Sequence, residues 1–179
     1  TQVTVTARPL KDRLYTANWK ENSYTIVFNV EGEVTRGEMK NIPLRYTQET
    51  TIPENGYVCG GYKFVGWRTG GKKSEQKVYQ PGDKVSRLCA TNNGTVNLYP
   101  IWEPCEYTIT FDYQTGNKRE KVTCKYKETY TLPTVNRLGW TFEGWSRFAG
   151  STNVISYAPN VKTAVFEDEK DFTLYAVYK

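Results

Sequence analysis

The chain has no histidine among its 179 residues and no Cys-x-x-Cys pair. Ser-His and Cys-His nucleophile systems are therefore excluded within this chain, because both use an imidazole as general base. Zinc sites of the usual spacing are excluded for the same two reasons. A GxxxxGK[ST] phosphate-binding loop is also missing. We expect no enzymatic activity, no cofactor and no catalytic or metal-binding residue.

Long apolar runs and strong local charge are missing as well. No stretch is apolar for long enough to cross a membrane, and the chain, which begins at Thr1, carries no signal peptide. The net charge is +5, but residues 21–103 and 104–179 each carry ten basic and nine acidic groups. Nearly neutral segments argue for no particular partner. Nucleic-acid binding is not expected, because the repeat pattern places most of the aromatic side chains in the core. We expect a piece of a larger secreted protein without membrane insertion.

What the chain does contain is an internal repeat. Three blocks of residues recur in the same order, 23–28 as 106–111, 62–67 as 140–145, and 98–102 as 174–178. Such a repeat indicates tandem small domains, which leave little room for a deep active site. The aromatic content of 15% is typical of β-structure and not of disorder.

The repeat predicts two complete units, residues 21–103 and 104–179. Residues 1–20 end in a segment, 14–19, that resembles the closing block 98–102. We interpret residues 1–20 as the closing segment of a preceding repeat, and the chain as part of a longer multi-repeat protein. The junction at Glu103 and Pro104 is very short, which favours semi-rigid units.

Alternating apolar residues such as Tyr24, Ile26 and Phe28 predict strands with one buried face. The tryptophans of the second block break this alternation, since Trp67 and Trp145 would fall on the polar face. A glycine before each is typical of a β-bulge, which would turn the tryptophan back into the core. Without the bulge, both side chains would be exposed stacking platforms for a ligand.

The four cysteines fall two per repeat, an even count that suits an oxidising, extracellular setting. Cys105 and Cys124 share the apolar face of one expected hairpin, so a disulfide between them is plausible if the register brings them together. Cys59 and Cys89 form the other candidate pair. The alternative is buried free thiols, which pack as small hydrophobic groups.

Each repeat combines a Tyr-Thr-Ile-x-Phe opening, an aromatic-x-Phe-x-Gly-Trp block, a Tyr-x-Pro-[Gly/Asn] turn (79–82, 157–160) and a Leu-Tyr-x-x-[Trp/Tyr] close. This order resembles the Listeria–Bacteroides repeat, a family that includes the B repeat of internalin-type surface proteins. The resemblance covers residues 23–103 and 106–179. The usual Asn-Gly-Gly turn is replaced here at 30–32 and 114–116, and the cysteines are a further departure.

The resemblance implies a mainly β, or α+β, fold of tandem small β-grasp-like modules, with about four strands each and at most a short helix. It implies secreted or surface-attached bacterial proteins, often adhesins, and supplies no catalytic motif to carry over. We therefore expect a non-enzymatic, extracellular stalk or spacer in a bacterial surface protein.

A binding module is the alternative function. The side chains of Arg119, Lys121, Lys125 and Lys127 share one strand parity, and form a basic stripe that suits an anionic glycan or a host protein. The plain interpretation is a solvated strand surface, where lysine also protects an edge from aggregation. The counterpart cluster of the first unit falls in a different block, so the stripe is not a repeated feature. This second basic cluster comprises Arg68, Lys72, Lys73 and Lys77. The acidic run 167–171 offers oxygen ligands for calcium but has no EF-hand spacing, which favours a solvated loop.

Overall fold

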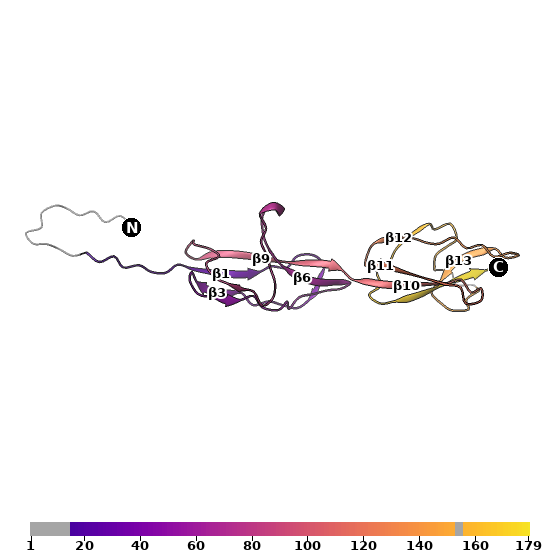
Figure 1. Ribbon diagram of the computed structural model, residues 1–179, viewed down its shortest axis with the longest axis horizontal. Helices are drawn as coiled ribbons and strands as arrows, with labels where there is room; N and C mark the ends of the chain where they lie inside the picture. Colours follow the sequence, from indigo (N-terminus) through magenta and orange to yellow (C-terminus); the bar gives the residue numbers. More distant parts are fainter. Residues whose placement is uncertain (1–14, 153–155) are drawn as a thin grey trace, which may run out of the picture.

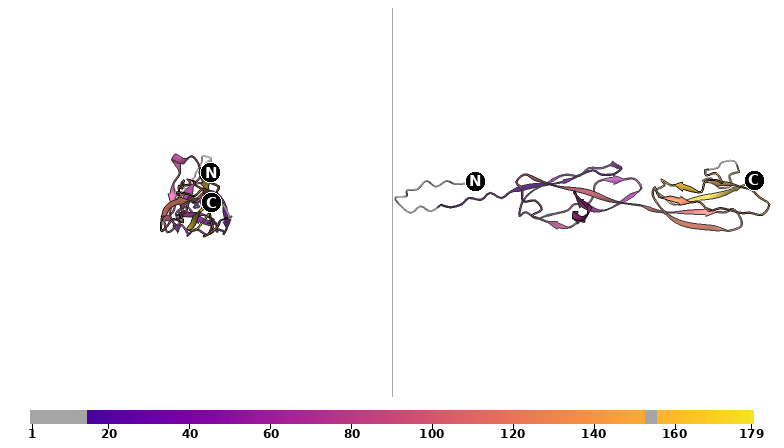
Figure 2. Two further views of the ribbon diagram at one scale, coloured as in Figure 1. Left: turned by 90° about the vertical axis from the view of Figure 1, so that its right-hand side faces the viewer. Right: turned by 90° about the horizontal axis from the view of Figure 1, so that it is seen from above.

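Two β-modules lie end to end in an elongated chain (Figure 1). This computed structural model describes residues 15–152 and 156–179. The end-on view in Figure 2 is narrow, whereas the view from above is as extended as Figure 1. The long axis of the molecule therefore follows the order of the repeats along the chain.

The first module contains a five-stranded sheet of order β3-β1-β9-β6-β7. β1 runs antiparallel to β3 and parallel to β9, and β9 runs antiparallel to β6. The bounds are β1 (Ser23–Phe28), β3 (Ile42–Arg45), β6 (Tyr62–Thr69), β7 (Val78–Tyr79) and β9 (Gly94–Pro104).

The second module contains a four-stranded sheet of order β11-β10-β15-β13, with the same directions in the same places. The bounds are β10 (Glu106–Asp112), β11 (Arg119–Lys125), β13 (Phe142–Ser146) and β15 (Phe172–Tyr178). A hairpin followed by a parallel central strand is the arrangement of a β-grasp sheet. The prediction of mainly β tandem modules is confirmed.

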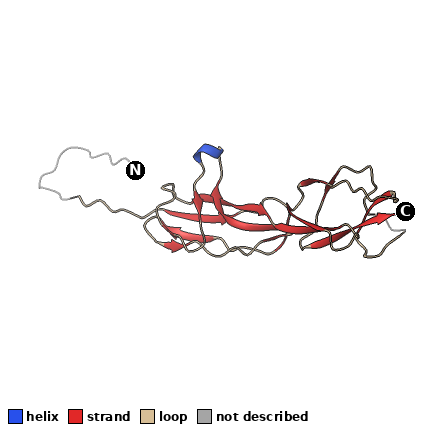
Figure 3. Cartoon of the chain, turned by 45° about the vertical axis from the view of Figure 1, so that its right-hand side comes forward, coloured by secondary structure: helices blue, strands red, loops and turns tan. Residues whose placement is uncertain are grey.

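In the described ranges, three two-stranded sheets complete the modules. They pair β2 (Val34–Arg36) with β5 (Val58–Cys59), β4 (Thr50–Thr51) with β8 (Lys84–Val85), and β12 (Thr129–Thr131) with β14 (Thr163–Val165). The one helical segment among the described residues is the 3-10 turn η1 (Lys73–Glu75), on a loop that projects from the first module (Figure 3). Strands thus supply nearly all of the regular structure.

The repeated blocks take the same register in both modules. Phe28 lies opposite Leu98 in the first module, as Phe111 lies opposite Leu174 in the second. All four side chains are buried. Because a shift of one residue would turn every apolar side chain to the other face of the strand, this shared pattern fixes the shared register.

The glycine before each tryptophan forms the predicted bulge. The pairing of β6 with β9 shifts between Phe64 and Gly66, where Gly66 has φ +152°. The same shift occurs in β13 before Trp145. Trp67 is 0% exposed and Trp145 is 1% exposed. Their burial is confirmed, and the alternative of exposed stacking platforms is wrong.

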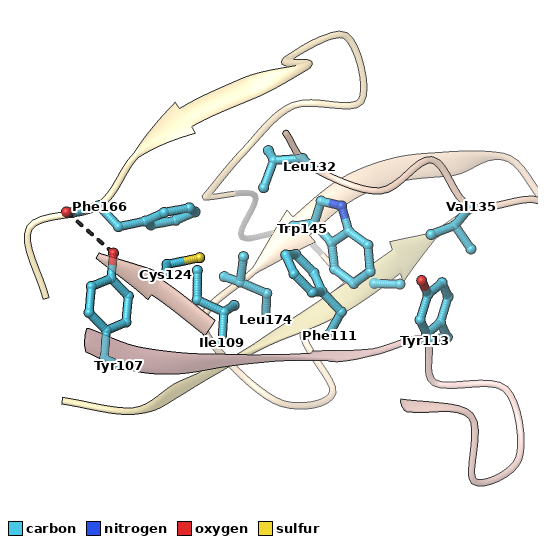
Figure 4. Packing of buried hydrophobic residues seen from close by; sticks show 11 residues of the cluster. Tyr107, Ile109, Phe111, Tyr113, Cys124, Leu132, Val135, Trp145, Phe166 and Leu174 are labelled. Atoms are coloured by element: carbon cyan, nitrogen blue, oxygen red, sulfur yellow. Dashed lines mark hydrogen bonds between the residues drawn. The ribbon is translucent and has the colours of Figure 1, made fainter. Parts of the chain in front are cut away.

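Each tryptophan is the centre of an aromatic core. Trp67 packs edge-on against Phe28 with ring centroids 4.8 Å apart, and Trp145 packs on Phe111 at 4.9 Å. Figure 4 shows Trp145 above Phe111 among the buried side chains of the second module. Edge-to-face pairs of this kind are favoured beyond the area that they bury. Two separate cores, one per module, follow from the repeat.

Pro100 stands in the middle of β9, where a proline removes a backbone donor. The pairing of β9 with β1 ends at Phe28 and Leu98, so β1 has stopped before Pro100 is reached. On its other side Pro100 lies opposite Trp67, next to the bulge. The central strand therefore accommodates the proline where only one neighbouring strand remains.

The predicted closing segment, residues 1–20, lies mostly outside the described residues. Its described part has no strand, and Trp19 is 93% exposed. The corresponding Trp102 of the first module is held by Phe64, with ring centroids 5.8 Å apart, and donates from Nε1 to the carbonyl of Glu31. The assignment of residues 1–20 to a preceding repeat stays a prediction.

Candidate functional site

The two modules are joined by a single residue, Cys105, between β9 and β10. The Cys105 amide donates to the carbonyl of Gly61 over 2.8 Å, and the Cys105 carbonyl accepts from the amide of Tyr126 over 2.9 Å. Backbone hydrogen bonds thus tie the connecting residue to the first module on one side and to the second on the other. No slack linker separates the modules.

The ring of Tyr126 fills the space beside the turn that precedes β6. A Cβ added to Gly61 would lie 2.4 Å from three ring carbons of Tyr126. On the next residue, Tyr62 packs edge-on against the same ring, with centroids 5.3 Å apart. The glycine therefore allows an approach that no other residue permits, and Tyr62 completes the contact.

An ion pair crosses the same junction. Lys127 Nζ lies 2.6 Å from Glu33 Oε2 and 5.5 Å from the ring centroid of Tyr126. The hydrogen bond that Lys127 donates to the Glu33 carboxylate raises the pKa of Lys127. Because the Glu33 side chain is 68% exposed, water screens the attraction, and we expect this pair to contribute little to stability. The pair orients the modules more than it stabilises them.

Lys127 does not belong to the predicted basic stripe. β11 ends at Lys125, and Lys127 has φ +58°, which turns its side chain out of the strand alternation and toward the first module. The stripe prediction is wrong for this residue. Strand parity failed there because it applies only while the backbone remains extended.

The other three stripe residues stay exposed on β11. Arg119 Nε lies 2.8 Å from Asp112 Oδ2, Lys121 lies opposite Thr110, and Lys125 lies opposite Glu106. Arg119 and Lys121 border a hollow of about 290 Å³ on the open face of the sheet. Its remaining lining residues are Thr110, Asp112, Thr173 and Tyr175. The structure thus places hydroxyl groups and one aromatic ring beside two of the predicted basic residues.

The second basic cluster is only partly brought together. Arg68 pairs with Glu31 and lies over the Tyr99 ring at 5.2 Å. Arg68 and Lys73 line a hollow of about 520 Å³ beside the projecting loop, together with Gln76, Val78 and Ile101. Lys72 and Lys77 are exposed and do not line it.

Neither predicted disulfide forms, because all four cysteines are free thiols in the structure. Cys124 lies opposite Tyr107, whereas Cys105 pairs with Tyr126, so the register does not place Cys105 and Cys124 opposite one another. Cys59 lies at the junction end of the first module, beside Val34. Cys89 contacts the carbonyl of Thr91, near the start of β9.

Carboxylates of the acidic run 167–171 accept hydrogen bonds from other segments of the module. Both oxygens of Asp168 accept from the guanidinium of Arg147, each over 2.7 Å, and Asp171 accepts from the amide of Thr108 over 2.7 Å. Two of the carboxylates are therefore engaged, and the solvated-loop interpretation is too simple. Within residues 15–152 and 156–179, no three His, Cys, Asp or Glu side chains gather as a metal site. The same residues include no helix with the length and hydropathy of a membrane span.

The comparison with known proteins identifies the repeat. The family model of the Listeria-Bacteroides repeat domain matches residues 24–99 and 107–177. The chain belongs to this family, which occurs in bacterial surface proteins and is not known for an enzymatic activity. The two matched ranges coincide with the two modules of the fold.

Two relatives from Evansella cellulosilytica are much longer than this chain. One, whose name calls it a Gly-rich membrane protein, is 26% identical over 136 residues, covering 75% of this chain and 15% of the relative. The other, named a membrane protein, is 26% identical over 164 residues, covering 91% of this chain and 22% of the relative. The chain therefore spans less than a quarter of either relative.

Proposed function

We propose that this chain is a non-enzymatic, extracellular segment of a bacterial surface protein or adhesin, and that its modules act as a stalk. The observation that carries the proposal is the junction, where one residue connects the central strand of one module to the first strand of the next. The chain enters and leaves each module along the long axis (Figure 1). Each repeat therefore adds its own length to the molecule.

The contacts at the junction also favour a stiff stalk. Flexible linkers let modules sample many orientations, and the mean distance they span grows only as the square root of their length. Here the Tyr126 ring, the Cys105 backbone and the Lys127–Glu33 pair act at one junction. Contacts of three kinds oppose bending and twisting together, so a distal domain would be held away from the cell.

Cell-surface display tests the stalk. The chain is placed between a cell-wall anchor and a short epitope, and compared with a Gly/Ser linker of equal residue number. We expect a large antibody-coupled bead to reach the epitope on the chain much more often than on the linker. Equal accessibility would contradict the stalk, because a flexible linker provides no stiffness.

The hollow beside Arg119 and Lys121 favours binding of an anionic glycan as a second candidate function. Thr110 and Thr173 offer hydroxyl groups, Lys121 offers a cation and Tyr175 a ring face within one small depression. Arg119 is already paired with Asp112, so Lys121 is the main cation available there. Affinity that depends on one or two exposed cations falls with added salt.

Charge reversal tests this binding. The chain is applied to an array of sulfated and phosphorylated glycans at physiological salt, beside the variant Arg119→Glu, Lys121→Glu and Lys125→Glu. The matched control is Lys72→Glu, Lys73→Glu and Lys77→Glu, which changes the net charge equally on the other module. Loss in the first variant alone would locate the site. Equal loss in both would indicate non-specific charge attraction, and a blank array would exclude these glycans.

A further inference from the structure

The contact at the junction has two sides, and each module carries both. Among the described residues, the two sides touch only where the modules join. The first side is a tyrosine just after the second strand of each hairpin. Tyr126 donates its backbone N–H to Cys105, and Tyr46 donates in the same way to Asn22, each over 2.9 Å. Cys105 and Asn22 both directly precede the first sheet strand of their module. The opening ends of the two modules therefore present a tyrosine at the same place.

The second side is a left-handed glycine followed by an aromatic residue. Gly61 has φ +74° and precedes Tyr62, while Gly139 has φ +77° and precedes Trp140. Both glycines stand six residues before the buried tryptophan of their module. The two modules therefore end in the same turn, with the same backbone conformation and an aromatic side chain next to it.

The surroundings of the two turns differ. The space beside Gly61 holds the Tyr126 ring, whereas a Cβ on Gly139 would meet no described atom within 4 Å. Trp140 is 51% exposed and Leu138 is fully exposed at this end. Large apolar side chains on one turn, with the vacant position between them, form a surface that the module itself does not bury.

A shallow hollow of about 180 Å³ adjoins the same turn, lined in part by Arg137, Trp140 and Tyr178. The Arg137 guanidinium lies 4.6 Å from the Trp140 ring centroid and 5.2 Å from that of Tyr178. Arg137 takes the place that Cys59 holds in the first module. A lysine at the Lys127 position would face this cation, so an opening end with a neutral residue there, such as Thr47, fits better.

We propose that this open end of the second module is a docking surface for the opening end of a further repeat of the same family, with the tyrosine of that repeat over Gly139 and against Trp140. The equivalent turn of the first module already contacts the opening end of the next repeat. That contact indicates which partner this surface binds. The inference rests on the proposed stalk function and names the partner of each stalk unit.

An extended chain tests the docking. Lys179 aligns with Lys20 in the closing segment, so a copy of residues 21–103 is appended directly after Lys179 in register. Hydrogen exchange is followed by mass spectrometry in a peptide that covers residues 137–141, which occurs once in the extended chain. We expect exchange there to slow about tenfold relative to the original chain, because docking buries the turn.

The tyrosines supply the matched control. Replacement of the appended copy's tyrosine by alanine should restore fast exchange, whereas Tyr46→Ala in the original first module should leave the slow exchange unchanged. Shared peptides from the middle of the sheet, such as those that contain Ile26, must show a single exchange population, which establishes that the appended module is folded.

If the first appended copy does not fold, residues 104–179 carrying Lys127→Thr are appended instead, and docking should then slow exchange in one of the two copies of the 137–141 peptide. Unchanged exchange at 137–141 beside a folded appended module would overturn the proposal. The display experiment uses only the original chain, so the stalk can stand or fail independently of this docking.

Discussion

The ring of Tyr126 in the second module lies so close to Gly61 in the first that a Cβ at Gly61 would be 2.4 Å from it. This distance is shorter than any van der Waals contact, so a substitution at one of the two positions affects the other. A side chain on the first residue must displace the ring of the second. The modules are therefore linked by shape as well as by the peptide chain.

Replacing Gly61 with alanine should be more damaging than replacing Gly139. Both residues have nearly the same positive φ, so an alanine at either is destabilising by about 1–2 kcal/mol through backbone strain. Only at Gly61 does the new methyl meet Tyr126, and overpacking adds about 1–3 kcal/mol. Chemical denaturation of the two variants compares the free energies of unfolding. Equal losses would show that the ring moves aside freely.

Truncation of either buried tryptophan should unfold its module. Trp67→Ala and Trp145→Ala each remove the centre of an aromatic core, which lowers the free energy of unfolding by about 3–5 kcal/mol. Small domains have only about 5–15 kcal/mol in total. Thermal unfolding followed by circular dichroism gives the result. An unchanged melting curve for either variant would refute the core assignment.

Replacing each buried tryptophan with phenylalanine should lower the free energy of unfolding by different amounts in the two modules. Nε1 of Trp145 donates to the carbonyl of Pro133 over 3.2 Å, whereas Nε1 of Trp67 is buried with no partner in the described part of the chain. Trp145→Phe loses a hydrogen bond and Trp67→Phe does not. We expect the former to be more destabilising by about 1 kcal/mol. Urea midpoints of the two variants measure the difference, and a reversed order would contradict this account.

Alkali should destabilise the second module first. Burial raises the pKa of Tyr107 and of Tyr113 to about 12, helped at Tyr113 by its hydrogen bond to Glu120. In the unfolded chain both titrate near their ordinary value of about 10. The folded module thus holds these protons longer than the unfolded one. Its stability is fully present below about pH 10 and is lost as the pH rises through about 12.

Absorbance of tyrosinate at 295 nm, recorded with the circular dichroism signal, checks this pH dependence. The late-titrating tyrosines should ionise together with unfolding. Tyr113→Phe removes one of the two tyrosines whose pKa is raised to about 12 and should reduce the alkaline loss, while Tyr15→Phe, at an exposed position, should not. Ionisation of every tyrosine near pH 10 without unfolding would contradict the burial of these hydroxyls.

The four thiols should all react in denaturant, and at different rates in the folded chain. Burial raises the pKa of Cys59 and Cys124, which lowers the fraction of reactive thiolate at neutral pH. Cys89 and Cys105 are only half-buried and should be alkylated sooner. Iodoacetamide labelling and mass spectrometry give the order. Fewer than four labelled cysteines in denaturant would reveal a disulfide that the structure does not contain.

Local patterns in the sequence predicted the modules well. The alternation of Tyr24, Ile26 and Phe28 predicted a buried strand face, and the glycine at position 66 predicted the bulge that buries Trp67. Both depend on neighbours along the chain, where side-chain direction follows a simple period. The same local rule was wrong for Lys127, because the backbone leaves the extended conformation before that residue.

The sequence by itself determined that there are two similar β-modules, because a repeated apolar pattern has the same buried register wherever it recurs. Only the tertiary structure decided what joins them. The contact between Tyr126 and Gly61, the pair of Lys127 with Glu33 and the separation of Cys59 from Cys89 all depend on distances between segments far apart in the chain. Such distances are set when strands assemble into sheets and one module packs on the next, and no local period encodes them.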